Sequence, residues 1–227
     1  MYQLFIANKN YSSWSLRIWV LMRTLGIGFS ERFMRFDDKD HAFSEFSPTS
    51  KVPCLVDGDL TVWESLAITE YLAEKHDGVW AADAKARAWS RSAAAEMHAG
   101  FSTLRNNHPM SVGLRIRPSS ISDALQRDIS RIDALWQQGL AAHGGPFLAG
   151  AGFTAVDAFF CPVAFRFQTY GTALSPASKH YMDHLLSLPA MQEWEQAALL
   201  EPWRDDAHEA EARDVGEWLA DLRAVPT

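Results

Sequence analysis

The sequence predicts a molecule in two parts: an α/β domain in the order βαβαββα, followed by an all-α domain. Three observations predict it. Short apolar runs alternate with a helix-period pattern in the first third of the chain. An Asp57-Gly58 step between two runs of β-formers is typical of a hairpin, because glycine adopts the positive φ of a tight turn. Beyond residue 83 only helical spacing remains. We therefore expect domains at residues 1–78 and 84–227.

The first domain opens with a strand, a loop, a helix and a second strand. Residues 2–7 form a short apolar run suited to a buried strand. The loop at 8–15 is rich in helix-capping residues, and apolar residues follow at helical spacing from Leu16 until Gly26 ends the pattern. Polar and apolar residues alternate at 29–36, which predicts the second strand.

The hairpin and the helix after it carry groups that could bind a small peptide. Pro53 lacks a backbone N–H and opens the first strand of the hairpin, so the main chain of Val52 is free to pair with a ligand. We expect Ser65 to cap the next helix, whose free amides would attract a carboxylate. Glu64 suits an ammonium group. An ordinary hairpin and helix with nothing bound would have the same pattern.

The second domain is predicted to consist of amphipathic helices. One apolar stripe runs from Trp89 to Leu104 and another from Leu125 to Leu140. A third helix should begin at the capping box formed by Thr154 and Asp157, and Pro162 lies within it. Further helices are expected at 181–188 and 189–198, with a tail helix at 214–222.

Composition limits the classes of function. The net charge of −7 argues against nucleic acid, because phosphate contacts need clustered Lys and Arg. No apolar run reaches the roughly 18 residues of a membrane span, and the N-terminus does not resemble a signal peptide, so we expect a cytoplasmic protein without a membrane partner. Cys54 and Cys161 are expected to be buried, inert thiols. His180 and His184 have the spacing of a metal pair but no obvious third ligand, so we expect no metal.

In combination, four short motifs resemble those of the glutathione S-transferase superfamily, and the resemblance covers essentially the whole chain. They are Ser12-Ser13, Val52-Pro53, Glu64-Ser65 and Thr154-x-x-Asp157. The resemblance implies a thioredoxin-like first domain, a helical second domain, a homodimer, and glutathione as cosubstrate.

The resemblance also implies roles for individual residues. Pro53 would follow a cis peptide bond, and Val52 would bind the cysteinyl backbone of glutathione. Glu64 and Ser65 would hold its γ-glutamyl end. Three nearby basic residues are candidates for the glycyl carboxylate: Lys39, His41 and Lys51.

The loop before the first helix resembles the serine-type classes, above all the zeta class with its Ser-Ser-Cys-Ser motif. Ser12 aligns with the catalytic serine of that class, and Trp14 stands where its cysteine would be, which puts the isomerase activity of zeta enzymes in doubt. A hydroxyl near the thiol would stabilise the reactive thiolate. Ser13 or Tyr11 could take this role instead, or the serines could merely cap the helix.

The electrophile is expected to bind between the domains, although each candidate could equally pack within the helical domain. The candidate lining residues are Trp14, Met97, His98, Phe101, Arg105, His108 and Met110. We therefore expect a detoxifying transferase that conjugates glutathione to a small hydrophobic electrophile. A glutathione-dependent isomerase, lyase or dehalogenase and a noncatalytic glutathione-binding scaffold are the alternatives.

Overall fold

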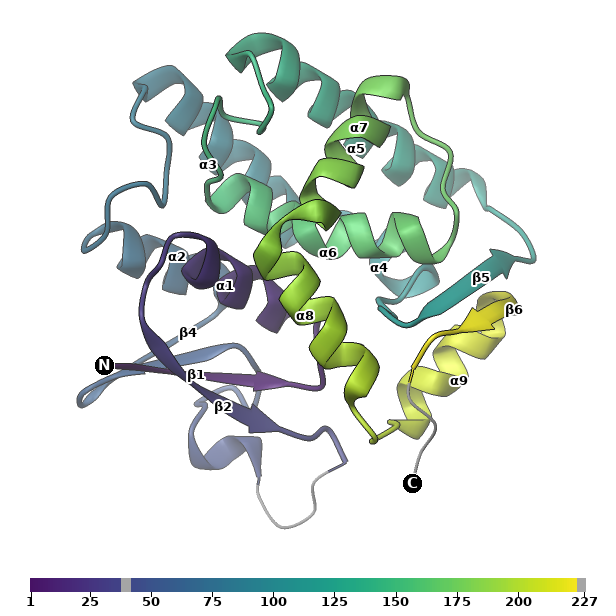
Figure 1. Ribbon diagram of the computed structural model, residues 1–227, viewed down its shortest axis with the longest axis horizontal. Helices are drawn as coiled ribbons and strands as arrows, with labels where there is room; N and C mark the ends of the chain where they lie inside the picture. Colours follow the sequence, from purple (N-terminus) through teal and green to yellow (C-terminus); the bar gives the residue numbers. More distant parts are fainter. Residues whose placement is uncertain (38–41, 224–227) are drawn as a thin grey trace.

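The computed structural model describes residues 1–37 and 42–223, in which a small sheet lies beside a larger group of helices (Figure 1). The N-terminal elements are β1 (Tyr2–Ala7), α1 (Ser13–Thr24), β2 (Phe29–Met34), a single 3-10 turn (Phe43–Glu45), β3 (Cys54–Asp57), β4 (Leu60–Trp63) and α2 (Ser65–Ala73). The predicted order is thus confirmed, with the 3-10 turn in the place of the second helix.

The N-terminal sheet is mixed, with the strand order β2-β1-β3-β4. β1 pairs in parallel with β2 and antiparallel with β3, and the predicted hairpin joins β3 to β4. Helix α1 is buried on most of its surface because it packs against both the sheet and α6 of the second domain. Leu4, Trp19 and Phe159 therefore belong to one continuous hydrophobic core that the two domains share. This is the thioredoxin-like arrangement that the resemblance implies.

The second domain is mainly helical, as predicted. Its helices are α3 (Ala84–Ala99), α4 (Ser102–Asn107), α5 (Asp123–His143), α6 (Ala155–Thr169), α7 (Pro176–Ser187), α8 (Pro189–Leu200) and α9 (Asp206–Val215). The predicted capping box at the start of α6 is confirmed, since Asp157 Oδ2 accepts from the Thr154 amide at 2.9 Å. The stripe from Trp89 to Leu104 spans two helices, because the chain breaks at Phe101, whose φ of 54° is left-handed.

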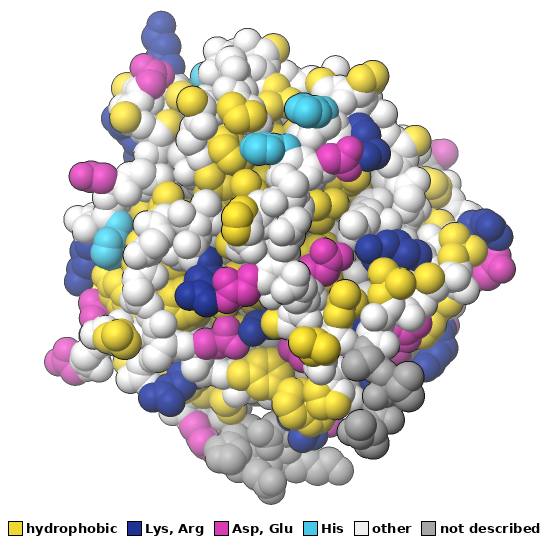
Figure 2. Space-filling view, viewed as in Figure 1, with side chains coloured by type: hydrophobic (Ala, Val, Ile, Leu, Met, Phe, Trp, Pro, Cys, Tyr) yellow, Lys and Arg dark blue, Asp and Glu magenta, His cyan; other side chains and the backbone are white. Residues whose placement is uncertain are grey.

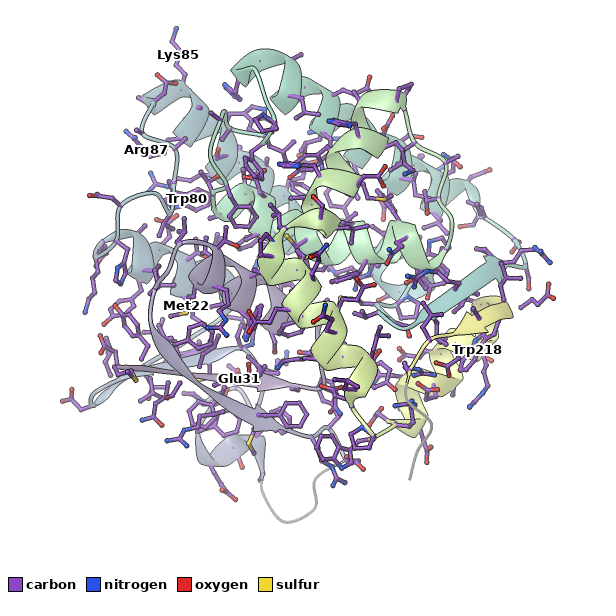
Figure 3. All side chains as sticks on the ribbon, in the orientation of Figure 1. Met22, Glu31, Trp80, Lys85, Arg87 and Trp218 are labelled. Atoms are coloured by element: carbon purple, nitrogen blue, oxygen red, sulfur yellow. The ribbon has the colours of Figure 1, made fainter. Side chains whose placement is uncertain are left out.

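The predicted tail helix at 214–222 is wrong. Helix α9 ends at Val215, and β6 (Gly216–Asp221) pairs antiparallel with β5 (Leu114–Pro118), a strand that the sequence analysis did not predict. Exposure alternates along β6, and Trp218 packs against the cluster of Leu114 and Ile116. Its indole N–H donates to Ala212 O at 3.3 Å, so Trp218 joins β6 to α9 (Figure 3). Packing of the partly buried Trp218 side chain against this cluster favours a strand over a helix at 216–221.

Surface and thiol features complete the description. Cys54 and Cys161 are free and buried, as predicted. Within residues 1–37 and 42–223, no helix combines the length and hydrophobicity that a bilayer crossing requires. Acidic and basic side chains are interspersed over the face shown in Figure 2.

Candidate functional site

The loop between β1 and α1 is held by the second domain. Asn10 is fully buried, and its side-chain amide donates to Ala198 O at 2.5 Å, at the end of α8. Its Oδ1 accepts from the Gly113 amide at 3.2 Å. The Ser12 amide donates to Asn8 O at 2.9 Å, which closes a turn. These bonds fix the position of the serines that follow.

Ser12 lies at the start of α1 and lines a cavity of about 540 Å³. Its hydroxyl makes no capping bond to the helix but donates to Ser15 Oγ at 2.7 Å. Ser15 is fully buried and also accepts from the Ala7 amide at 3.3 Å. The helix therefore does not need the Ser12 hydroxyl as a cap, and a short rotation would turn it toward a ligand in the cavity.

The two rival hydroxyls have other partners. Ser13 Oγ accepts from Arg166 Nη2 at 3.3 Å. The Tyr11 hydroxyl donates to Glu209 Oε1 at 2.5 Å and accepts from Arg223 Nη1 at 3.1 Å. Burial and the Glu209 carboxylate raise the pKa of Tyr11, so its phenol stays neutral. Of the three candidate hydroxyls, that of Ser12 has another serine as its one partner among the residues that the structure describes.

A second cavity of about 220 Å³ contains most of the residues expected to bind a peptide. It is lined by Trp14, Thr49, Lys51, Val52, Pro53, Glu64 and Ser65. The Val52–Pro53 peptide bond is cis, as expected. Among the described residues, the main chain of Val52 makes no turn, loop or cap hydrogen bond. Trp14, Lys51 and Val52 also line the larger cavity, so the two cavities adjoin.

The start of α2 differs from the prediction in one respect. Ser65 does not cap the helix; Glu64 occupies the cap position with a φ of 66°, and its side chain makes no cap bond. The helical bonds begin with the Ile68 amide, which donates to Glu64 O at 2.9 Å. The amides of residues 65–67 therefore have no partner inside the helix and can receive an anion.

His98 and Phe101 are not among the residues that line either cavity. His98 lies behind the smaller one, with Nδ1 3.4 Å from Ser65 Oγ and its ring edge-on to Trp14. Burial and the nearby Arg17 lower the pKa of His98, so it is largely neutral at pH 7. Phe101 packs in the hydrophobic core.

The remaining predicted residues divide into two groups. Trp14, Arg105 and Met110 line the larger cavity, whereas Met97 and His108 are buried and do not line it.

Of the three basic candidates for the glycyl carboxylate, Lys39 and His41 lie outside the described residues. Lys51 thus stands as the one predicted partner for a glycyl carboxylate among the residues that the structure describes.

Several residues of the site were not singled out by the sequence analysis. His208 and Glu211 of α9, Phe36 and Phe43 complete the wall of the larger cavity. The sequence analysis predicts no helix at 206–213, where most of α9 lies. Arg166 also lines this cavity, and its only sequence signal is a charged residue within the apolar run of α6.

Three arginines from both domains gather around the loop. Arg17 is 1% exposed, and among the described residues its Nε and Nη1 have no hydrogen-bond partner. Its guanidinium lies 4.1 Å from the centre of the Trp14 ring. Burial, together with the charges of Arg166 and Arg105, lowers the pKa of Arg17. The site is therefore electropositive and suited to a bound anion.

Comparisons with known proteins identify similar sequences and folds. Residues 11–75 match the family model described as the N-terminal domain of glutathione S-transferase. Over 32 residues the chain is 62% identical to a dichloromethane dehalogenase of Methylophilus leisingeri, but the match spans only 14% of this chain and 12% of that protein. Over 157 residues it is 27% identical to a zeta-class glutathione S-transferase of Euphorbia esula, covering 66% of this chain and 70% of that one.

The fold is shared with solved structures. One is a glutathione transferase homolog from Burkholderia with bound glutathione, which superposes with a TM-score of 0.66 at 21% identity and covers 87% of this chain and 97% of its own. At this identity the likeness shows the fold alone. Residues 11–75 thus carry a glutathione S-transferase N-terminal domain, and the chain as a whole is similar to a zeta-class member of that superfamily and shares the fold of its solved structures.

Proposed function

We propose that the protein is a glutathione transferase of the serine type. Glutathione occupies the smaller cavity, with its γ-glutamyl end on Glu64 and the amides of residues 65–67, and its cysteinyl backbone pairs with Val52. Its thiol points toward Ser12 in the larger cavity. One observation carries the proposal: the cavity that contains these peptide-binding groups adjoins the cavity that contains the Ser12 hydroxyl.

The chemistry requires a thiolate at neutral pH. Lowering the pKa of a thiol by two units takes about 2.7 kcal/mol of differential stabilisation. A hydrogen bond from Ser12 and the N-terminus of α1 supply terms of this size, and the nearby guanidinium of Arg17 adds a favourable charge. The thiolate then attacks the carbon of a small hydrophobic electrophile. A C–S bond forms as the leaving group departs with its bonding electrons.

A second candidate is glutathione-dependent dehalogenation. It is supported by the 62% identical segment shared with the dichloromethane dehalogenase. The first step is the same, since a halide leaves as the thiolate attacks, and only the fate of the conjugate differs. We also propose the cytoplasmic homodimer that the resemblance implies, which light scattering and cell fractionation would test.

Substitution of Ser12 by Ala tests the proposal. We expect kcat with 1-chloro-2,4-dinitrobenzene to fall about 100-fold, as when one donor to a developing or bound anion is removed. The affinity for glutathione, measured by calorimetry, should change less than threefold. Ser92→Ala, at an exposed position on α3, is the matched control.

Two companion variants assign the hydroxyl. Tyr11→Phe should keep kcat within threefold of the wild type, because its phenol is bound to Glu209. Wild-type kcat in Ser12→Ala, with a large loss in Ser13→Ala or Tyr11→Phe, would move the role to that residue. If the wild-type protein did not bind glutathione, the proposal would be rejected.

A further inference from the structure

The wall of the larger cavity contains two guanidinium groups that are held by neutral atoms. Arg166 is 4% exposed; its Nε donates to His108 O at 2.9 Å and its Nη2 to Ser13 Oγ at 3.3 Å. Arg105 on α4 donates through Nη1 to Gly100 O and, at 3.4 Å, to Met97 O. Backbone carbonyls and a hydroxyl orient both groups without neutralising their charges.

Within residues 1–37 and 42–223, neither arginine is paired with an acidic side chain. Among the residues that the structure describes, no carboxylate oxygen lies within 4.0 Å of a guanidinium nitrogen of Arg105 or Arg166. Arg223 shows the contrast: it is buried like Arg166 but is paired with Glu209 and Asp221. A buried cation without a counter-charge is costly. Arg166 is buried and Arg105 is half-buried, so an arrangement that keeps both guanidinium groups on one cavity indicates an anionic ligand.

The charges around this wall leave it positive. The charge of Asp128 favours the protonated form of Arg105, but this carboxylate already accepts a hydrogen bond from the Leu104 amide. Glu211 on α9 lines the cavity and is exposed to solvent, and Lys51 lines the same cavity. Arg17 lies behind Trp14 and adds a third guanidinium.

Part of the remaining lining is suited to an apolar body. Trp14, Phe36, Phe43, Pro109 and Met110 line the same cavity. We propose that the electrophile taken by this cavity carries an anionic group, such as a carboxylate, on an apolar body, and that this group binds Arg105 and Arg166. The inference rests on the proposed function, because glutathione must occupy the adjoining cavity for the electrophile to be the second ligand.

Two glutathione conjugates of matched shape test the proposal on the full-length protein. S-carboxymethylglutathione places a carboxylate beside the sulfur, and S-carbamoylmethylglutathione places a neutral amide there. We expect calorimetry to show about tenfold tighter binding of the carboxylate, as for a charge-assisted hydrogen bond. Arg105→Gln should remove most of this preference and leave the affinity for free glutathione within threefold.

Further variants distinguish the loss of an anion-binding group from a folding defect. Arg166→Gln loses several internal bonds, so Arg166→Lys, which keeps the charge, should recover part of the preference. Arg131→Gln, which breaks an exposed pair with Glu96, should keep all of it.

Three outcomes would overturn the inference. Equal affinity of the two conjugates in the wild type would show that the wall does not select an anion. An equal loss of glutathione and conjugate affinity in Arg105→Gln would assign the arginines to the glycyl carboxylate of glutathione itself. If the wild type bound neither conjugate nor glutathione, the proposed function would fail and this inference with it.

Discussion

At the scale of single residues, His108 is a buried side chain whose two ring nitrogens make no hydrogen bond to the described residues. It is 1% exposed, and its ring stacks on Tyr170 with centroids 4.0 Å apart. Burial and the neighbouring Arg166 lower the pKa of His108 to about 4. The native state therefore holds this imidazole neutral at pH values where the unfolded chain protonates it.

This predicts a pH dependence of stability. Between pH 6.5 and 4 the unfolded chain binds more protons at His108, so this residue makes the free energy of unfolding fall as the pH is lowered, by at most roughly 3 kcal/mol. Asp157 and Glu201, whose pKa values burial raises to about 6 and about 7, act in the opposite direction.

The variant His108→Phe isolates the effect of His108. It keeps the stacking and has no proton to bind, so urea unfolding should show a smaller loss of stability than the wild type between pH 6.5 and 4. Its stability at pH 7 should be equal or higher, because two unsatisfied nitrogens are removed. An identical pH profile for the two proteins would contradict this.

At the scale of elements, α6 depends on the carboxylate of Asp157. Its two oxygens accept from the amides of Leu148 and Thr154 and from the Tyr181 hydroxyl, all at 2.9 Å. The Thr154 hydroxyl donates to this carboxylate as well, at 3.2 Å. Asp157→Ala therefore takes the partner from four buried donors, and we expect a loss of about 3 to 5 kcal/mol in urea unfolding. The control Asp183→Ala, which removes an exposed pair with Lys179, should cost less than about 1 kcal/mol. A similar loss of unfolding free energy in the two variants would contradict the role of the Asp157 carboxylate in stabilising α6.

The elements that could be predicted from the sequence are those specified by neighbouring residues. The Asp57-Gly58 turn and the box of Thr154 and Asp157 contain their own hydrogen-bonding groups, and both were predicted. β5 and β6 pair about a hundred residues apart, and no local pattern reports that contact. Leu219 and Leu222 fit helical spacing, yet both are half exposed, and burial of Trp218 favours the strand.

The candidate site shows the same division. Ser12, Val52 and Glu64 lie in local motifs and were predicted to bind glutathione, and the structure places them on two adjoining cavities. Arg166 reaches Ser13 from 153 residues away, and Glu211 reaches the cavity from α9. Only the packing of the two domains brings these residues together, so the charge of the electrophile cavity could not be predicted from spacing.

At the scale of the whole molecule, the C-terminal segment closes one side of the site. Arg223 is ion-paired with Glu209, and both bind the Tyr11 hydroxyl next to Ser12. His208 stacks on the Tyr11 ring with centroids 4.9 Å apart. The cavity wall formed by α9 is thus fixed to the loop that contains Ser12.

Removing the ion pair between Glu209 and Arg223 should lower the stability of the protein, and it should raise the KM for the electrophile more than the KM for glutathione. Glu209→Ala leaves the Arg223 guanidinium buried beside Asp221 alone, and we expect the free energy of unfolding to fall by about 3 kcal/mol. The KM for the electrophile should rise several-fold while that for glutathione stays within twofold. Glu217→Ala, which breaks an exposed pair with Arg117, is the control. An equal rise in both KM values would show that α9 does not act on the electrophile alone.

The central claim is that Ser12 stabilises the thiolate of bound glutathione. The most direct test is to titrate the ultraviolet absorbance of that thiolate in complexes of the wild type and of Ser12→Ala. We predict a thiol pKa about two units below that of free glutathione in the wild type, and a clearly smaller shift in the variant, which keeps only the N-terminus of α1 and the charge of Arg17. A wild-type thiol that titrates like free glutathione, or an equal shift in both proteins, would contradict the claim.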